Sequence, residues 1–426
     1  MKHFLVFFCY WVILFFTFFD SLLGNCTFTA IVSAMKLIRY ICYLGILFLI
    51  LQNTKGILVK KWGGGFYALF LYFLLVGILS IPGFVHYGLG GFMHYKQFFV
   101  LLLIVNAFYY YPKLTGKTFD SLITRFVYIG SIFSIINLAC FFVRPSFVNI
   151  VFVDRFSAGY PTVDVVPLAF CLMSCLLYEN LKMNKIIRLI CSVILLISLL
   201  TQFSGSGTVF MILILLSVFL YCIKVFKKKK KNVVISNFRM FLVSIFLISF
   251  SCISYLLNEF PSVIESSLPV LENRLLTLAG KSDESTLGIN TMEMRKDQYK
   301  KSIKYYGDNL IIGTGYGPVT IEESKRDKAE YIFIENQYTH NIIVIGYIGS
   351  ILFIFFILNN TYKSFRCNDE LSYKTLYVLS GVMYMLGSNN ICTLDIIQSF
   401  VPFCLYWAMR ESRLDSYKLK YVNSCL

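Results

Sequence analysis

The chain has 426 residues, of which 57% are hydrophobic, 17% aromatic and only 15% charged, and its formal net charge is +16. Soluble globular chains are about half apolar and about a quarter charged. A mean hydropathy of +0.69 is too high for a water-soluble domain of this length, because its interior cannot hide so much apolar surface. The composition excludes an ordinary soluble enzyme and indicates an integral membrane protein.

Long apolar runs, separated by short polar or basic connections, cover most of the sequence. Each run is close to the roughly 20 residues that a helix needs to cross the hydrocarbon. We predict spans at residues 3–23, 37–54, 64–82, 96–111, 122–143, 164–181, 185–201, 207–226, 238–257, 341–359, 373–389 and 392–409. The expected fold class is therefore an all-α integral membrane protein with about twelve transmembrane helices.

Basic residues fall on alternate connections, and the positive-inside rule makes that side cytoplasmic. They are Lys55, Lys60, Lys61, Lys113, Lys117, Lys182, Lys185, Arg188, Lys224, the run Lys227 to Lys231, Arg239, Lys363, Arg366, Lys374, Arg410, Arg413, Lys418 and Lys420. Both termini are then cytoplasmic. We interpret the lysine run as a topology anchor and expect no nucleic-acid partner.

Four segments follow from this topology: helices one to nine at 1–257, a large extracytoplasmic loop at 258–340, helices ten to twelve at 341–409, and a cytoplasmic tail at 410–426. Arg39 departs from the charge pattern, because it begins the second span on the outer side. Met35 is an alternative start that would remove the first span.

The large loop is predicted to be partly helical. Residues 262–280 have the apolar spacing of an amphipathic helix, which could lie on the membrane or pack within the protein. A flexible stretch at 281–290 precedes a second helix at 291–306, where Arg295 and Tyr299 share one face. An arginine on an apolar, aromatic face is a candidate for ligand binding, and a snorkelling or salt-bridged arginine is the alternative.

Three alternate glycines, Gly313, Gly315 and Gly317, precede Pro318. This pattern predicts a tight turn whose backbone approaches another group closely. One interpretation is a phosphate-binding nest of amides, and a plain loop is the other. The motif is not a Walker loop, because no Lys-Ser or Lys-Thr pair follows it.

His340 and Asn341 begin the tenth predicted span at the outer membrane interface. An imidazole there could accept a proton from a substrate hydroxyl near neutral pH, although a capping or interfacial histidine is an alternative. His86, His94 and His340 all map to the outer side, but their spacing matches no metal motif. We therefore expect no metal and no cofactor.

Arg155 lies in the outer loop before the sixth span. A charge at the membrane edge that faces a cavity is a functional candidate. The alternative is an ion pair with Asp154 or Asp164.

Taken in order, these motifs resemble the bacterial O-antigen polymerase and O-antigen ligase superfamily. The set is Arg155 with Ser157 and Gly159, Arg295 with Tyr299, Gly313-x-Gly315-x-Gly317, His340-Asn341 and Gly346-x-x-Gly349. The likeness in architecture covers nearly the whole chain, whereas the local motifs cover 154–164 and 295–349.

The resemblance implies a GT-C-like helical membrane fold, an undecaprenyl-pyrophosphate glycan donor and metal-independent transfer on the outer face of the plasma membrane. It implies that Arg155 and Arg295 hold pyrophosphate and that His340 activates the acceptor. The substrate-binding residues that it implies are Tyr299, Gly313, Gly315, Gly317 and Asn341.

Three functions remain open at this point. A repeat-unit polymerase would transfer a glycan from undecaprenyl pyrophosphate to the non-reducing end of another lipid-linked repeat unit, building O-antigen or capsular polysaccharide. A ligase would attach the finished glycan to another acceptor. A lipid-linked sugar flippase is the more distant alternative, since few charged residues besides Asp20 and Asp395 lie within the spans. A chain-length regulator and a flippase of the same pathway are expected partners, together with the lipid bilayer.

Overall fold

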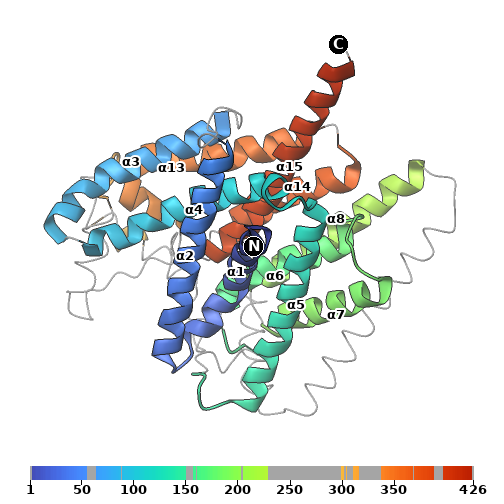
Figure 1. Cartoon of the computed structure of the whole chain (residues 1–426), viewed down its shortest axis with the longest axis horizontal. Helices are drawn as coiled ribbons and strands as arrows, with labels where there is room; N and C mark the ends of the chain where they lie inside the picture. Colours follow the sequence, from blue (N-terminus) through green and yellow to red (C-terminus); the bar gives the residue numbers. More distant parts are fainter. Residues whose placement is uncertain are drawn as a thin grey trace.

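The computed structural model describes residues 2–54, 64–87, 89–149, 157–159, 161–202, 205–228, 299–301, 304, 310–315, 337–367, 369–387 and 397–424. Its named helices are α1 (Lys2–Gly24), α2 (Thr29–Thr54), α3 (Gly64–Tyr87), α4 (Leu89–Thr115), α5 (Phe119–Val143), α6 (Pro161–Leu177), α7 (Lys185–Thr201), α8 (Gly205–Lys228), α13 (Gln337–Arg366), α14 (Leu371–Gly387) and α15 (Ile397–Ser424). They pack into one helical bundle (Figure 1).

Every predicted span except the ninth coincides with one of these helices. Four helical stretches are long and apolar enough to cross a membrane: Leu5–Gly24, Thr29–Gln52, Phe119–Val143 and Tyr338–Arg366. The chain is thus an α-helical membrane protein, while the count of twelve spans and the GT-C-like arrangement stay predictions. The ninth span at 238–257, the amphipathic helix at 262–280 and the stretch at 281–290 lie outside the described residues.

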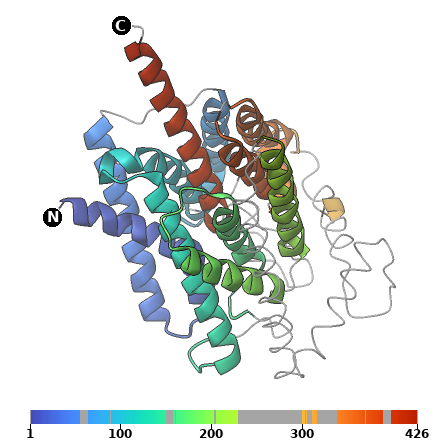
Figure 2. The same cartoon turned by 90° about the vertical axis from the view of Figure 1, so that its right-hand side faces the viewer.

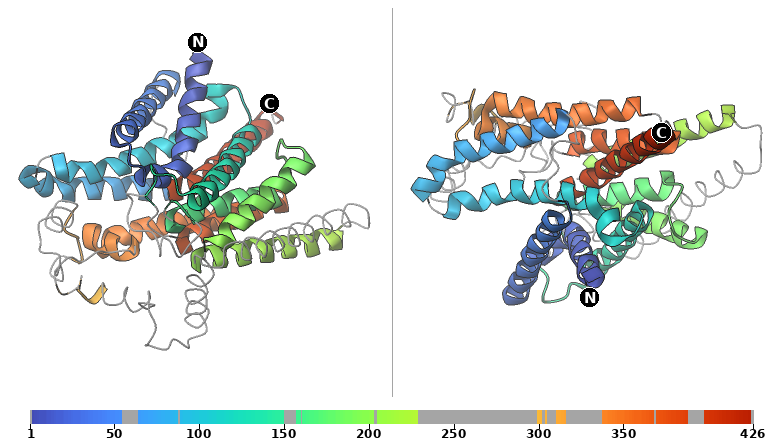
Figure 3. Two further views of the ribbon diagram at one scale, coloured as in Figure 1. Left: turned by 90° about the horizontal axis from the view of Figure 1, so that it is seen from below. Right: turned by 45° about the horizontal axis from the view of Figure 1, so that its top comes forward.

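Helices distant in sequence form the centre of the bundle. The helices α3 and α13 run side by side along much of their length (Figures 1 and 3). The helix α15 packs against α4 and α6, and α6 also contacts α5, α7 and α8. The end of α15 extends beyond the other helices (Figure 2). The predicted tail therefore continues the last helix as far as Ser424.

The helix α1 is an integral part of the bundle. Its Asp20 carboxylate accepts a hydrogen bond from the Arg39 guanidinium of α2 at 2.9 Å. The same guanidinium lies 4.9 Å from the centre of the Phe16 ring. The unexpected charge of Arg39 is therefore paired with α1, and a chain without the first 34 residues would leave it unpaired.

We predict that Asp20→Ala destabilises the protein, because Arg39 would remain mostly buried without its counter-ion. Removing one partner of a buried pair costs about 3 kcal/mol or more. Thermal unfolding of the purified protein in detergent measures the effect. The matched double variant Asp20→Ala, Arg39→Met should recover most of the lost stability. An unchanged unfolding midpoint in the single variant would contradict the prediction.

Candidate functional site

His340 and Asn341 lie in the first turns of α13 and are buried, with 4% and 2% of their surfaces exposed. The Tyr72 hydroxyl of α3 donates a hydrogen bond to the Asn341 side-chain oxygen at 3.3 Å. Within the described part of the chain, the Asn341 side-chain nitrogen has no protein hydrogen-bond partner. Both residues are therefore buried in the bundle rather than lying on an open interface, and Asn341 is in contact with α3. A buried amide donor without a partner is costly unless a ligand or water satisfies it.

The helix α13 is broken five residues after Asn341. Gly346 has φ 66° and ψ −176°, which is not a helical conformation. Such a break leaves carbonyls before it and amides after it without their helical partners. In a membrane protein these groups need other partners, because lipid offers none.

The segment Leu310 to Gly315 supplies those partners. The Thr314 and Gly315 amides donate to the carbonyls of Ile343 and Val344 at 2.9 and 2.8 Å. In the opposite direction, the Tyr347 amide donates to the Leu310 carbonyl at 2.9 Å. Backbone hydrogen bonds thus connect this segment to carbonyls before the break and to an amide after it.

Glycine is required on both sides of this contact. Gly313 and Gly315 have φ of 94° and 73°, values that other residues rarely adopt. A Cβ on Gly313 would lie 2.5 Å from the Gly346 amide nitrogen, and one on Gly315 would overlap the Leu79 carbonyl of α3. A Cβ on Gly346 would overlap the Ile311 carbonyl. The turn, α3 and the break in α13 therefore approach one another backbone to backbone.

This geometry changes the interpretation of the glycine-rich turn. The close approach predicted from the sequence is present, but the group approached is the backbone of α13 and α3. The amides of Thr314 and Gly315 already donate to carbonyls, so they do not form an open phosphate nest in this structure. A substrate-binding role for Gly313 and Gly315 stays a prediction, and Gly317 lies outside the described residues.

Tyr299, from the predicted second loop helix, contacts α13 at the same place. Residues 299–301 and 304 are helical, and the Tyr299 and Tyr347 hydroxyls are hydrogen-bonded at 3.1 Å. This hydrogen bond, together with partial burial and the neighbouring hydroxyl, raises the pKa of Tyr299 above its ordinary value. Tyr347 follows Gly346 directly, so the tyrosine pair lies at the break. Arg295 itself lies outside the described residues.

The predicted site residues thus fall into two groups. His340, Asn341, Gly313, Gly315 and Tyr299 all gather on or near the first part of α13. Arg155 lies outside the described residues, although the segment 157–159 that follows it is described. That segment is held by α1 and α5.

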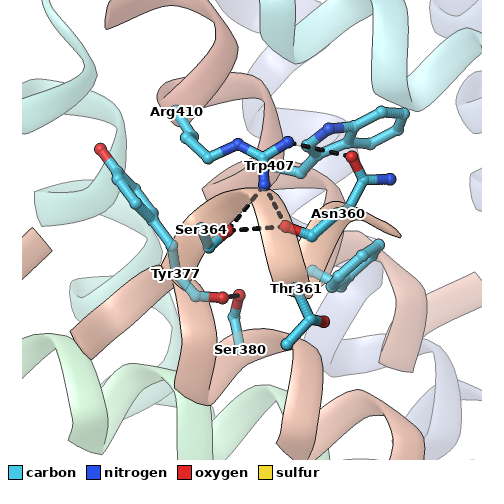
Figure 4. Close-up of a pocket in the computed structure, with 8 residues that line it drawn as sticks. Asn360, Thr361, Ser364, Tyr377, Ser380, Trp407 and Arg410 are labelled. Carbon is cyan, nitrogen blue, oxygen red and sulfur yellow. Dashed lines mark hydrogen bonds between the residues drawn. The ribbon is translucent and has the colours of Figure 1, made fainter. Parts of the chain in front are cut away.

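A buried arginine that the sequence reasoning assigned only to the cytoplasmic tail lies at the far end of α13. The Arg410 guanidinium, with the residue 1% exposed, donates to the Ser364 hydroxyl at 2.6 Å and to the Asn360 side-chain oxygen at 2.9 Å. It also donates to the Asn360 carbonyl (Figure 4). In addition, it pairs with Glu411.

The cavity beside Arg410 measures about 10 Å³ and is lined by Asn360, Thr361, Ser364, Tyr377, Ser380, Phe403, Trp407 and Arg410. It has room for about one water molecule. We therefore interpret the cluster as a structural polar contact that holds α13, α14 and α15 together. Polar residues spaced four apart within 341–366 share one face of a helix, and an arginine follows the last apolar run. Together these two features could have predicted the cluster.

Within the described part of the chain, no three His, Cys, Asp or Glu side chains lie close enough together to hold a metal ion.

We predict that Gly315→Ala and Gly346→Ala each detach the turn from the broken helix. The positive φ alone costs a side chain about 1–2 kcal/mol, and the overlaps with backbone carbonyls add to it. Thermal unfolding in detergent measures the loss. Gly45→Ala in α2 is the control, because its nearest neighbour would be the Cys9 sulfur at 3.8 Å. Equal unfolding midpoints for all three variants would contradict the close contact between the turn and the broken helix.

Comparison with known proteins adds one match. A model of the O-antigen ligase family matches residues 190–357, less than half of the chain. No curated protein matches the sequence. The matched segment includes Arg295, Tyr299, the glycine-rich turn and His340-Asn341, whereas Arg155 lies before it. This match supports the placement of the chain in the superfamily of O-antigen polymerases and ligases.

Proposed function

We propose that this protein is a membrane glycosyltransferase of the polymerase type, which transfers a glycan from undecaprenyl pyrophosphate to the non-reducing end of another lipid-linked repeat unit. The observation that carries the proposal is the buried His340-Asn341 pair at the start of α13, where Asn341 is hydrogen-bonded to Tyr72 of α3. The family match over 190–357 supports the reaction class.

The reaction joins two sugars and releases a diphosphate. The acceptor hydroxyl oxygen attacks the anomeric carbon of the donor glycan, the bond from that carbon to the pyrophosphate oxygen breaks, and undecaprenyl pyrophosphate leaves with the electron pair. The hydroxyl proton passes to the His340 imidazole, which acts as general base. The negative charge that develops on the leaving group needs a cationic partner.

Arg155 and Arg295 are proposed to provide that partner. Guanidinium groups bind phosphate oxygens in a planar, bidentate geometry and keep their charge at every physiological pH. Helical geometry puts residues four apart on one face. Tyr299, four residues after Arg295 in the sequence, is hydrogen-bonded to Tyr347 at the break in α13.

Asn341 is proposed to orient the acceptor. Its side-chain oxygen is occupied by Tyr72, which fixes the amide, and its nitrogen remains available to donate to a sugar hydroxyl. A hydroxyl held in this way beside His340 would be presented in one orientation, which lowers the entropic part of the barrier. Tyr299 would supply an aromatic contact near the same place.

The charge pattern supports a plasma-membrane location with the active face outside and both termini in the cytoplasm. The lipid tail of each substrate would then stay in the bilayer. A flippase that delivers lipid-linked repeat units and a chain-length regulator are the proposed partners.

A ligase is the second candidate, because the matching family is described by that activity. The donor chemistry would be the same, and only the acceptor would differ. Deletion of the gene separates the two functions. Loss of a polymerase leaves single repeat units attached to the acceptor, whereas loss of a ligase leaves long chains on the polyprenyl carrier.

We predict that Arg295→Ala abolishes long surface chains, with turnover lowered roughly 10²-fold or more because the leaving group loses a charge partner. Chain-length ladders of surface polysaccharide, together with the amount of the protein in membranes, measure the effect. Lys300→Ala, which removes an exposed cation from the same helix, should leave the ladder unchanged. Long chains at normal protein levels in the Arg295 variant would end the assigned role.

We predict that His340→Gln lowers turnover of lipid-linked repeat units roughly 10²- to 10⁴-fold, the range for loss of a general base. Purified protein in liposomes, assayed with synthetic lipid-linked substrates, gives the rate. Tyr338→Phe is the matched control, because it removes only a hydroxyl that donates to the Met385 carbonyl. Equal rates for both variants would exclude His340 as the base.

A further inference from the structure

The break at Gly346 separates the part of α13 that carries His340 and Asn341 from the rest of that helix. In an unbroken helix, backbone hydrogen bonds fix the position of each residue relative to the residues one turn away. The non-helical φ and ψ of Gly346 interrupt that continuity. The position of Asn341 in the bundle therefore depends on contacts with other elements.

One side chain of α3 contacts α13 on both sides of this break. The Tyr72 hydroxyl donates a hydrogen bond to the Asn341 side-chain oxygen at 3.3 Å. The Tyr72 ring lies against the Phe353 ring, with the two ring centres 5.3 Å apart. Asn341 precedes Gly346 and Phe353 follows it, so Tyr72 spans the break.

The ring of Tyr72 is fixed by packing. Tyr72 and Phe353 are each 1% exposed. Phe353 in turn packs edge-on against Tyr384 of α14, with 6.5 Å between the ring centres. The Tyr72 hydroxyl therefore reaches Asn341 from a position that its neighbours determine.

Ring packing alone does not require the Tyr72 hydroxyl. A phenylalanine would make the same ring contacts without burying a polar group, and one neutral hydrogen bond adds little net stability. The hydroxyl does, however, set the orientation of Asn341. The last torsion of an asparagine side chain has a broad, two-fold preference, so the amide can exchange the places of its oxygen and nitrogen. The bond from Tyr72 commits the oxygen to α3 and leaves the nitrogen, which has no partner among the described residues, to bond to a ligand.

We infer that Tyr72 is a positioning residue for the acceptor: through its contacts on both sides of the break, it holds the Asn341 amide so that the nitrogen donates to the attacking sugar hydroxyl. This inference rests on the proposed function of Asn341. It predicts that Tyr72 influences acceptor binding through Asn341 and leaves donor binding unchanged.

The test uses purified protein in liposomes and two synthetic substrates built on the repeat unit of the producing cells. The donor is the undecaprenyl-pyrophosphate form with its acceptor hydroxyl blocked. The acceptor is the same glycan on a lipid without phosphate, which cannot donate. Tyr72→Phe keeps the ring and removes only the hydroxyl. It should raise the KM for the acceptor roughly 3- to 10-fold, the range for one neutral hydrogen bond, with the donor KM unchanged.

Two further comparisons separate positioning from a structural effect. In an Asn341→Leu background, Tyr72→Phe should cause no further loss, because the group being oriented is already absent. Tyr10→Phe is the matched control, because Tyr10 is also 1% exposed and its hydroxyl donates to the Ala107 carbonyl of α4. It should leave both KM values unchanged. If Tyr72→Phe does not accumulate in membranes, Phe353→Leu, which loosens the ring and keeps the hydroxyl, replaces it with the same expected direction.

Two outcomes overturn the inference and leave the proposed function standing. One is an unchanged acceptor KM in Tyr72→Phe when Asn341→Leu is impaired, since a purely structural hydroxyl would change only the amount of folded protein. The other is losses that multiply in the double variant, which would assign Tyr72 an effect independent of Asn341. Full activity in Asn341→Leu would instead reject the proposed function of Asn341, and the role of Tyr72 with it.

Discussion

The organisation of the candidate site depends on one constraint: a broken helix inside a membrane bundle must find new partners for its backbone. Gly346 interrupts α13, and the Leu310 to Gly315 segment then bonds to both sides of the break. Backbone-to-backbone contact of this kind is possible only where side chains are absent, which accounts for glycine at 313, 315 and 346. The segment from Leu310 to Gly315 is therefore fixed to the helix that carries His340 and Asn341, and the tyrosine pair at 299 and 347 adds a second contact at the same place.

Much of this arrangement could be predicted from the sequence, but the partners could not. In the described part of the chain, eleven of the predicted apolar runs overlap helices, because a bilayer requires backbone groups to pair within each crossing segment. The glycine spacing correctly indicated a close backbone approach. It carried no information on what was approached, since Gly346 and Leu79 are far away in sequence. The burial of Arg410 and the hydrogen bond from the Asn25 side chain to the Ala158 carbonyl were not predicted for the same reason. Both depend on residues that are brought together only by packing.

The bundle contains two kinds of polar assembly. At the end of the last helix, Arg410 joins the polar side chains of α13 in a space that holds about one water molecule. Every guanidinium nitrogen but Nε is bonded there, which suits a permanent structural tie. Around α3 and the start of α13, in contrast, the Asn341 side-chain nitrogen has no partner among the described residues. A fixed donor without a protein partner can bond to a substrate without first giving up another hydrogen bond. Such a site needs little reorganisation when charge develops during a transfer reaction.

The insertion of Leu310 to Gly315 into α13 also limits how such proteins can be recombined. A loop grafted from another protein would meet the break in α13 with a backbone of different geometry. The graft would then leave main-chain amides and carbonyls unmatched in a lipid environment. A workable chimera has to exchange the loop together with both helices that receive it.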